Sequence, residues 1–367
     1  MDRLYFNGDK SAFKACLTLF EADGLKHYAL ADKGREKGVV AQIAGGDEPV
    51  NAGLYRAYAD NLAKAVGRVY AEGGPEADRF RANLRRFAAY KAWHATQQVR
   101  QRVREADGDT EAGTKVLHAF NRWQAAEYNT AVARCRTAKQ WDAFAQDDNR
   151  RLFPNIVWLP SRSATPRELH AAFWNRVWPK DDPFWNENQP GNLWNCKCDW
   201  EETDEPPTDG NPKAAVKHDG LEGNPAKTGE IFTDNASYIR KASKTVEHYA
   251  LKLTRTDSYE WAKEHLKGTE VRNEDSGLEI AMSGRGIKEY LSQNHDDYYV
   301  KNEMIRRMPQ VLKNAEYCGK TTHKGRRSEI FKVILSGKEN FIICNYQDDQ
   351  RLYFYSITES EKVIKGK

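Results

Sequence analysis

The chain has 367 residues, of which 40% are hydrophobic and 30% are charged, and its formal net charge at pH 7 is +4. This length predicts two or three domains, and the composition lets each of them bury a core. No apolar run approaches the roughly 20 residues that cross a bilayer, so no membrane partner is expected. The N-terminus lacks the basic and apolar sections of a secretory signal. Six cysteines are too few for a disulfide scaffold, so we expect a reducing compartment.

Helices dominate the prediction for residues 1–145. Two apolar stripes are present in this region. The second stripe runs from Leu117 to Trp141 and contains Cys135. We expect Cys135 in the core rather than in a reactive site. Glycine, proline and aspartate interrupt the helices at 73–78 and 106–113. The first stripe has the spacing of one helix face and consists of Leu84, Ala88, Ala92, Ala95, Val99 and Val103.

Residues 146–200 differ in composition from the predicted helical region before them. Prolines at positions 154, 160, 166, 179, 183 and 190 exclude long helices. One short helix is predicted over 167–174, directly after Pro166. Residues 201–235 are rich in proline, glycine and charge, and this composition predicts an exposed linker.

Residues 236–367 are predicted to form a smaller α+β domain. Helical patterns come first, and short apolar or alternating segments separated by turn residues then predict an antiparallel sheet. The expected fold class is therefore α+β, with a helical N-terminal module, an irregular segment rich in Cys and Trp, and this C-terminal domain. The helical patterns cover 238–252, 259–266, 287–293 and 298–312, and the strand patterns cover 329–336, 340–346 and 351–358.

Cys196 and Cys198 form the strongest candidate for a metal site. In a tight turn both sulfurs can face one ion, and His170 could add an imidazole and Asp199 a carboxylate. A structural zinc ion is the cofactor that these ligands suggest, although structural zinc usually uses two ligand pairs. The alternative is a pair of small buried thiols beneath a lid of large aromatic side chains, formed by Trp185, Trp194 and Trp200.

Several of these residues follow one another in an order that resembles the head-morphogenesis family of tailed bacteriophages, typified by the phage Mu F protein. The family pattern is an Arg-x-x-His step, an acidic-Pro-x-Trp step, a proline turn and a terminal Cys-basic-Cys. The resemblance covers residues 80–235 and includes 220–233, although Lys197 stands where arginine is more usual and 192–194 where a second proline often stands. The matching residues are Arg167, His170, Asp182, Phe184, Trp185, Pro190, Cys196, Lys197 and Cys198.

The resemblance implies a minor head protein that acts in capsid assembly near the portal vertex. The implied partners are the portal protein, the major capsid protein or the scaffold, with packaged DNA or RNA as a further candidate. The implied location is the bacterial cytoplasm during assembly and then the virion head. This N-terminal module is not expected to be an enzyme.

Positive charge concentrates in the C-terminal domain. Residues 300–340 contain ten Lys or Arg against four Glu, a local charge of +6, and tyrosines lie nearby. This combination suits a phosphate backbone with unstacked bases, whereas the alternative is an ordinary solvated surface. The candidate nucleic-acid contacts are Lys301, Arg306, Arg307, Lys324 and Arg327.

Helices followed by a short sheet, with basic residues and histidines, make this domain similar to the barnase/EndoU/colicin/RelE-type ribonucleases. That resemblance implies RNA cleavage without a metal or other cofactor. His295 and His323 are then the candidate proton carriers, Arg326 a phosphate contact and Thr358 a hydrogen-bond donor. The alternative is a non-catalytic domain that binds nucleic acid or a capsid protein, in which case the whole chain is structural.

Overall fold

The computed structural model describes residues 33–163, 166, 168–210, 218–240, 242–323 and 325–364. The chain divides into two compact units. The first unit comprises Met1–Gly73 and Asn83–Ala250, and the second comprises Gly74–Ala82 and Leu251–Lys367. The expected α+β class is confirmed, because a helical region and a segment rich in Cys and Trp precede a C-terminal sheet with helices. Of the predicted features, residues 1–32, Arg167, Lys324 and the side chain of His323 lie outside the described residues.

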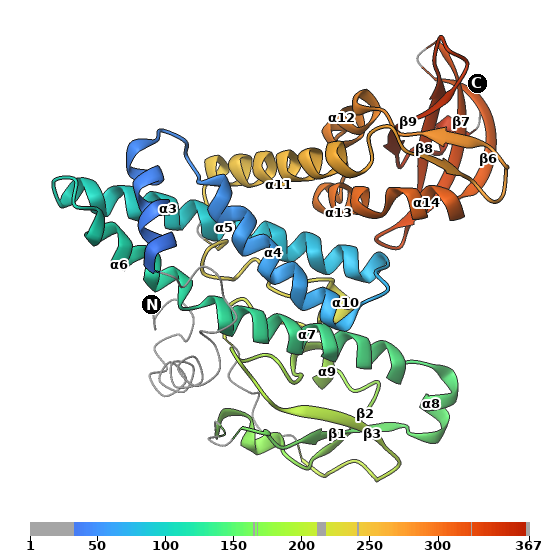
Figure 1. Ribbon diagram of the computed structural model, residues 1–367. Coiled ribbons are helices and arrows are strands. Elements are labelled where there is room, and N and C mark those ends of the chain that lie inside the picture. Colours follow the sequence, from blue (N-terminus) through green and yellow to red (C-terminus); the bar gives the residue numbers. More distant parts are fainter. Residues whose placement is uncertain are drawn as a thin grey trace. The chain divides into compact units, whose positions relative to one another are not determined.

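The first unit is built on long helices, as the sequence predicts. Pairs of them pack together, α4 against α7 and α3 against α6 (Figure 1). Every member of the stripe from Leu84 to Val103 is buried, and so is Cys135. The second predicted stripe is divided by a short break at 122–123. The helices are α3 (Lys33–Gly45), α4 (Ala52–Val69), α5 (Pro75–Glu105), α6 (Thr110–Asn121), α7 (Gln124–Phe144) and the short α8 (Asp147–Leu152). None of the helices among the described residues is long and apolar enough to cross a membrane.

A small antiparallel sheet follows these helices, with the strand order β2-β1-β3. Its strands are β1 (Asn155–Leu159), β2 (Val177–Pro179) and β3 (Asp199–Thr203). The predicted helix over 167–174 is a 3-10 helix, η2 (Glu168–Phe173), and α9 (Phe184–Glu187) adds one more turn. Because β1 and β3 pair with Trp158 opposite Trp200, large aromatic side chains meet in one core, which contains Phe144, Ile156, Trp158, Phe173, Trp178, Trp185 and Trp200.

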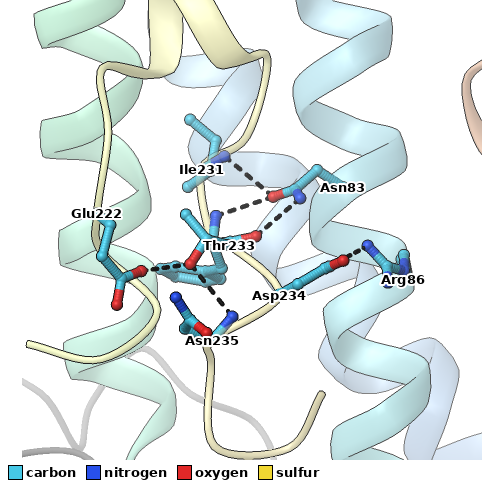
Figure 2. A network of polar contacts seen from close by, with 8 residues as sticks. Asn83, Arg86, Glu222, Ile231, Thr233, Asp234 and Asn235 are labelled. Atoms are coloured by element: carbon cyan, nitrogen blue, oxygen red, sulfur yellow. Dashed lines mark hydrogen bonds and ion pairs between the residues drawn. The ribbon is translucent and has the colours of Figure 1, made fainter. Parts of the chain in front are cut away.

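The predicted linker differs from the structure in its second half. Residues 201–210 are largely exposed, but residues 218–235 pack into the first unit around a short helix, α10 (Pro225–Thr228). Figure 2 shows how Asn83 of α5 holds this segment. Its Oδ1 accepts hydrogen bonds from the backbone nitrogens of Ile231 (3.0 Å) and Phe232 (2.9 Å), and its Nδ2 donates to the Phe232 carbonyl (2.9 Å). The side chains of Ile231 and Phe232 are fully buried, so apolar anchors within a polar sequence explain the difference.

Arg134 of α7 fastens the same segment from another side. Its guanidinium is completely buried and donates to the side-chain oxygen of Asn192 at 2.9 Å and to three consecutive carbonyls, those of Leu221 (2.9 Å), Glu222 (3.1 Å) and Gly223 (3.2 Å). Buried carbonyls outside regular structure need such partners. Burial lowers the pKa of Arg134 to about 10, which leaves the group charged at neutral pH.

The second unit is a mixed six-stranded sheet with helices, in the strand order β4-β5-β9-β8-β7-β6. The two predicted hairpins join β7 to β8 and β8 to β9, and both pairs are antiparallel. Three strands, β4, β5 and β6, and the parallel pairing of β5 with β9 were not predicted from the sequence. The strands are β4 (Glu270–Arg272), β5 (Glu279–Ala281), β6 (Glu316–His323), β7 (Arg326–Leu335), β8 (Lys338–Tyr346) and β9 (Leu352–Thr358).

Helices cover one face of this sheet. Gly286 lets α12 approach β9 closely, because a Cβ at that position would lie 1.9 Å from the carbonyl oxygen of Phe354. The core between helices and sheet includes Ile287, Met308 and Phe331. These helices are α11 (Lys244–His265), which also contributes to the first unit, α12 (Gly284–Ser292), α13 (Tyr298–Met304), η3 (Ile305–Arg307) and α14 (Met308–Asn314). The short η4 (Glu361–Val363) lies on the other face, where Val363 packs against Ile330, Phe341 and Ile343.

Replacing Arg134 with methionine is expected to destabilise the first unit, because three buried carbonyls lose their donor. At about 1–3 kcal/mol for each unsatisfied group, the free energy of unfolding should fall by about 3 kcal/mol or more. The control is Arg136→Met, at an exposed position on the same helix, which should change stability by about 0.5 kcal/mol or less. Denaturant titration followed by tryptophan fluorescence reports the first unit, since every tryptophan except Trp261 belongs to it. Equal effects of the two substitutions would contradict this account.

Candidate functional sites

The structure brings His170, Cys196 and Cys198 together, as the sequence predicts. Their ligand atoms all lie within 4.8 Å of one another. The Nδ1 atom of His170 is 3.6 Å from the Cys196 sulfur and 3.7 Å from the Cys198 sulfur. The imidazole is only 2% exposed. Two sulfurs and one imidazole nitrogen therefore form a group that could hold a metal such as zinc.

Fixed backbone contacts position the two cysteines. Asn195 has a positive φ of 58°, which turns the chain just before Cys196. The backbone N–H of Asn195 donates to the Thr130 hydroxyl on α7 at 2.8 Å, and that of Arg162 donates to the Lys197 carbonyl at 3.1 Å. The residue between the two cysteines is thus tied to the chain that follows β1. The loop presents both sulfurs to the imidazole without help from a regular strand.

Two tryptophans, Trp158 and Trp174, lie beside this group. The Trp158 ring packs edge-on against the His170 ring, with centroids 5.1 Å apart. The indole N–H groups of Trp158 and Trp174 favour the thiolate form of Cys198 and so act to lower its pKa. Both indole nitrogens are buried, and neither has a hydrogen-bond partner within the described part of the chain. Buried N–H donors without a partner beside a cysteine are compatible with a negatively charged sulfur, such as a metal-bound thiolate.

The pKa values of the two thiols are shifted in opposite directions. A hydrogen bond from Cys198 and the positive charge on His170 hold the pKa of Cys196 well below its usual range. The hydrogen bond to Cys196 and burial raise the pKa of Cys198. A divalent cation bound between the two sulfurs would favour the thiolate form of both cysteines. The Nε2 atom of His170 is buried and has no hydrogen-bond partner among the described residues, so Nδ1 is the ring nitrogen that faces the sulfurs.

Asp199, the other predicted ligand, lies outside this group of described residues. Its carboxylate accepts hydrogen bonds from Arg162 (3.1 Å), from Gln140 (3.4 Å) and from the backbone N–H of Trp200 (3.1 Å). Trp185 and Trp200, two of the three tryptophans of the predicted lid, belong to the core against which Cys198 packs. Trp194 instead packs against Phe232, with ring centroids 5.1 Å apart.

In the second unit, three of the predicted nucleic-acid contacts are engaged within the protein. Lys301 is fully buried, and its Nζ donates to the carbonyls of Tyr290 (2.7 Å) and Gln293 (2.6 Å) at the end of α12. Arg306 pairs with Asp257 at 2.7 Å, and Arg307 pairs with Asp78. Burial and Arg255 lower the pKa of Lys301 to about 7, whereas the two carbonyls favour its charged form. These contacts favour structural roles for the three side chains.

The predicted catalytic residues are divided between the two ends of the sheet. His323 pairs with Arg326 at one end, where β6 meets β7. Thr358 pairs with Phe341, which pairs with Lys332 of β7. Since Lys332 is six residues from Arg326, Thr358 and Arg326 are separated by about 20 Å along the strands. The arrangement does not bring these predicted residues into one site.

His295 lies at the Thr358 end of the sheet. Its Nε2 contacts the side-chain oxygen of Asn340 at 2.8 Å, and the neighbouring Glu359 carboxylate is 3.4 Å away. Its Nδ1 accepts a hydrogen bond from the backbone N–H of Asp297 at 2.9 Å. The side chain is 2% exposed. Both ring nitrogens are therefore engaged within the protein.

A group of residues that the sequence analysis did not single out lies at the other end of the sheet. Glu329 of β7 is completely buried and accepts hydrogen bonds from the hydroxyls of Tyr317 (2.6 Å) and Tyr346 (3.1 Å). The guanidinium of Arg327 stacks 3.7 Å from the centre of the Tyr346 ring. Burial and the Glu329 hydrogen bond raise the pKa of Tyr317 to about 12. We call Tyr317, Glu329 and Tyr346 the Tyr-Glu-Tyr group.

Comparison with known families identifies a domain in the second half of the chain. Residues 250–336 match the family described as large polyvalent protein-associated domain 3. This range runs from α11 through β7 and contains Tyr317 and Glu329. The head-morphogenesis family gave no match, so that resemblance stays a prediction. No curated protein and no solved structure matches the chain.

The ligand group of the first unit predicts stoichiometric binding of a thiophilic divalent metal. Titration of the reduced, metal-free chain with Co²⁺ should give sulfur-to-cobalt charge-transfer absorption. The absorption should stop increasing at about one equivalent of Co²⁺ per chain. Cys196→Ser and Cys198→Ser should each weaken this band, because one of the two sulfur ligands is lost, and the double substitution should abolish it. Cys318→Ser removes a half-buried thiol of the second unit and should leave the band unchanged. A band of undiminished intensity in both single variants would show that the metal binds elsewhere.

Proposed function

We propose that the chain is a minor head protein of a tailed phage or prophage and that its first unit acts in capsid assembly near the portal. The observation that carries this proposal is the convergence of the ordered motif. His170 from the first step, Trp185 from the second and the two cysteines from the last lie in or against one aromatic core. Residues from separate steps of a motif are expected to meet when the motif encodes one folded element.

The metal that the proposal assigns to His170, Cys196 and Cys198 is zinc. Two thiolates and one imidazole are ligands that zinc prefers, and the tryptophan shell keeps the site dry. When bound, zinc would supply cross-linking rather than catalysis, joining η2 to the loop before β3. The partners in this proposal are the portal protein, the major capsid protein or the scaffold, in the assembling head.

The assembly role is tested in the phage or prophage that encodes the chain. Deleting the gene should stop the formation of infectious particles, and the tagged chain should copurify with the portal protein. Complementation with Cys196→Ser should fail or become temperature-sensitive, because the irregular segment loses its cross-link. Complementation with Cys318→Ser is the matched control and should restore infection. Normal particles that lack the chain would refute the proposal.

We propose further that the second unit cleaves RNA without a metal. The observation that favours this second function is the placement of Lys320, Arg326 and Arg327, which are exposed on neighbouring strands. The Tyr346 ring stacks against Arg327, and the Tyr346 and Tyr317 hydroxyls both donate to Glu329. Exposed cations next to aromatic rings suit a phosphate backbone with unstacked bases.

Incubating the full chain with labelled RNA in EDTA separates this function from simple binding. We expect cleavage to persist in the chelator and to leave 2′,3′-cyclic phosphate ends, because the 2′-hydroxyl acts as the nucleophile. RNA with 2′-deoxy residues should remain intact. Salt-dependent binding of uncleaved RNA would instead identify a binding domain, and the absence of both would remove RNA as the target.

A further inference from the structure

We propose that the Tyr-Glu-Tyr group is the proton-transfer centre of the second unit and that Arg327 is its phosphate contact. This inference rests on the proposed ribonuclease activity and names the residues that would perform it. The substrate class is single-stranded RNA, recognised through its 2′-hydroxyl and its phosphate. The site differs from the one suggested by His295, which lies at the opposite end of the sheet.

The strand register places the parts of this centre on one face of the sheet. Residues directly opposite each other in antiparallel strands project to the same side. Lys320 of β6 is opposite Glu329, and Glu329 is opposite Cys344 of β8. Arg327 precedes Glu329 by two positions and therefore shares its face. Two exposed cations thus flank one buried carboxylate, and only tyrosine hydroxyls are bonded to its oxygens in the described structure.

The burial of Glu329 determines how it could act. A carboxylate with no exposed surface cannot touch an RNA strand, but Tyr317 and Tyr346 are only half-buried. Each hydroxyl donates to a different carboxylate oxygen, Tyr317 to Oε2 and Tyr346 to Oε1. The tyrosine hydroxyls are therefore the catalytic residues that meet the substrate. Glu329 is a positioning residue that receives and returns a proton through them.

The cleavage step balances with these three groups alone. The 2′-oxygen bonds to phosphorus and passes its proton to the Tyr317 oxygen, while the Tyr317 proton moves to Glu329. The bond from phosphorus to the 5′-oxygen breaks, and that oxygen takes the hydroxyl proton of Tyr346. Protonated Glu329 then restores the proton of Tyr346. The products are a 2′,3′-cyclic phosphate and a 5′-hydroxyl, and every protein group ends as it began.

The charges and acidities of the group fit this path. A tyrosine whose pKa is raised to about 12 stays protonated at neutral pH, so Tyr317 must lose its proton to Glu329 as it accepts one from RNA. The Arg327 guanidinium remains charged, and its stacking on the Tyr346 ring places positive charge beside the proposed donor to the leaving oxygen. Positive charge there would stabilise the additional negative charge on the phosphate in the transition state.

The test uses the full chain, labelled RNA and EDTA, with one hydroxyl removed at a time. Tyr317→Phe and Tyr346→Phe should each lower kcat by about 10²–10⁴-fold with little change in KM. Arg327→Ala should mainly raise KM and flatten the salt dependence of binding. The matched control is Tyr353→Phe, which removes another half-buried hydroxyl that donates to a carboxylate, that of Asp349 at 2.8 Å. It should retain full activity.

A substrate with sulfur in place of the 5′-bridging oxygen separates the two tyrosines. A thiolate leaves without a proton, so this substrate should restore cleavage by Tyr346→Phe and should not restore cleavage by Tyr317→Phe. A purely structural role of the hydroxyls would give no such difference. Glu329→Gln should lose cleavage of both substrates, with Glu339→Gln, at an exposed position of β8, as its active control. Thermal unfolding of every variant shows which of them are folded.

The outcomes distinguish this site from the activity on which it rests. If the wild-type chain cleaves RNA and both folded tyrosine variants cleave it equally well, the activity stands and this assignment of residues is overturned. If the wild-type chain leaves RNA intact, the ribonuclease proposal fails and the inference fails with it. Loss of activity in both variants, with sulfur rescue of Tyr346→Phe alone, is the result that we expect.

Discussion

The meeting of two sulfurs and an imidazole nitrogen in a dry aromatic core is the constraint on which the first unit depends. Burial disfavours a thiolate unless positive charge lies close to it. The positions of His170, Cys196 and Cys198 make sense if a cation supplies that charge. The surrounding elements position these residues. The β1–β3 register brings Trp158 and Trp200 together, and η2 carries His170.

Irregular backbone elsewhere in the protein is held by buried polar side chains. Arg134 and Asn83 bind the backbone of the segment after residue 218, which follows no regular ladder. The second unit uses the same solution. Asn273 donates to the carbonyls of Leu312 (2.7 Å) and Ala315 (2.8 Å), and Lys301 closes the end of α12. In each case a side chain replaces the backbone partner that a helix or strand would have provided.

The parts of this structure that were predictable from sequence are those with a local signal. The apolar stripe of α5 and the two C-terminal hairpins follow from periodicity, and the candidate metal ligands follow from the Cys-x-Cys spacing and an upstream histidine. The strands β4 and β5 have three residues each, which is too short for alternation to be recognised. A glycine and several polar residues conceal β6. The Tyr-Glu-Tyr group has no sequence spacing to detect, because its members come from three adjacent strands.

X-ray absorption at the zinc K-edge of the purified, zinc-loaded chain tests the central claim most directly, because it reports the identity of the ligand atoms. The account predicts two sulfur ligands at about 2.3 Å and an imidazole nitrogen at about 2.0–2.1 Å. The sulfur shell should lose one member in Cys198→Ser. A shell made only of oxygen and nitrogen, or two sulfurs that persist in that variant, would contradict it.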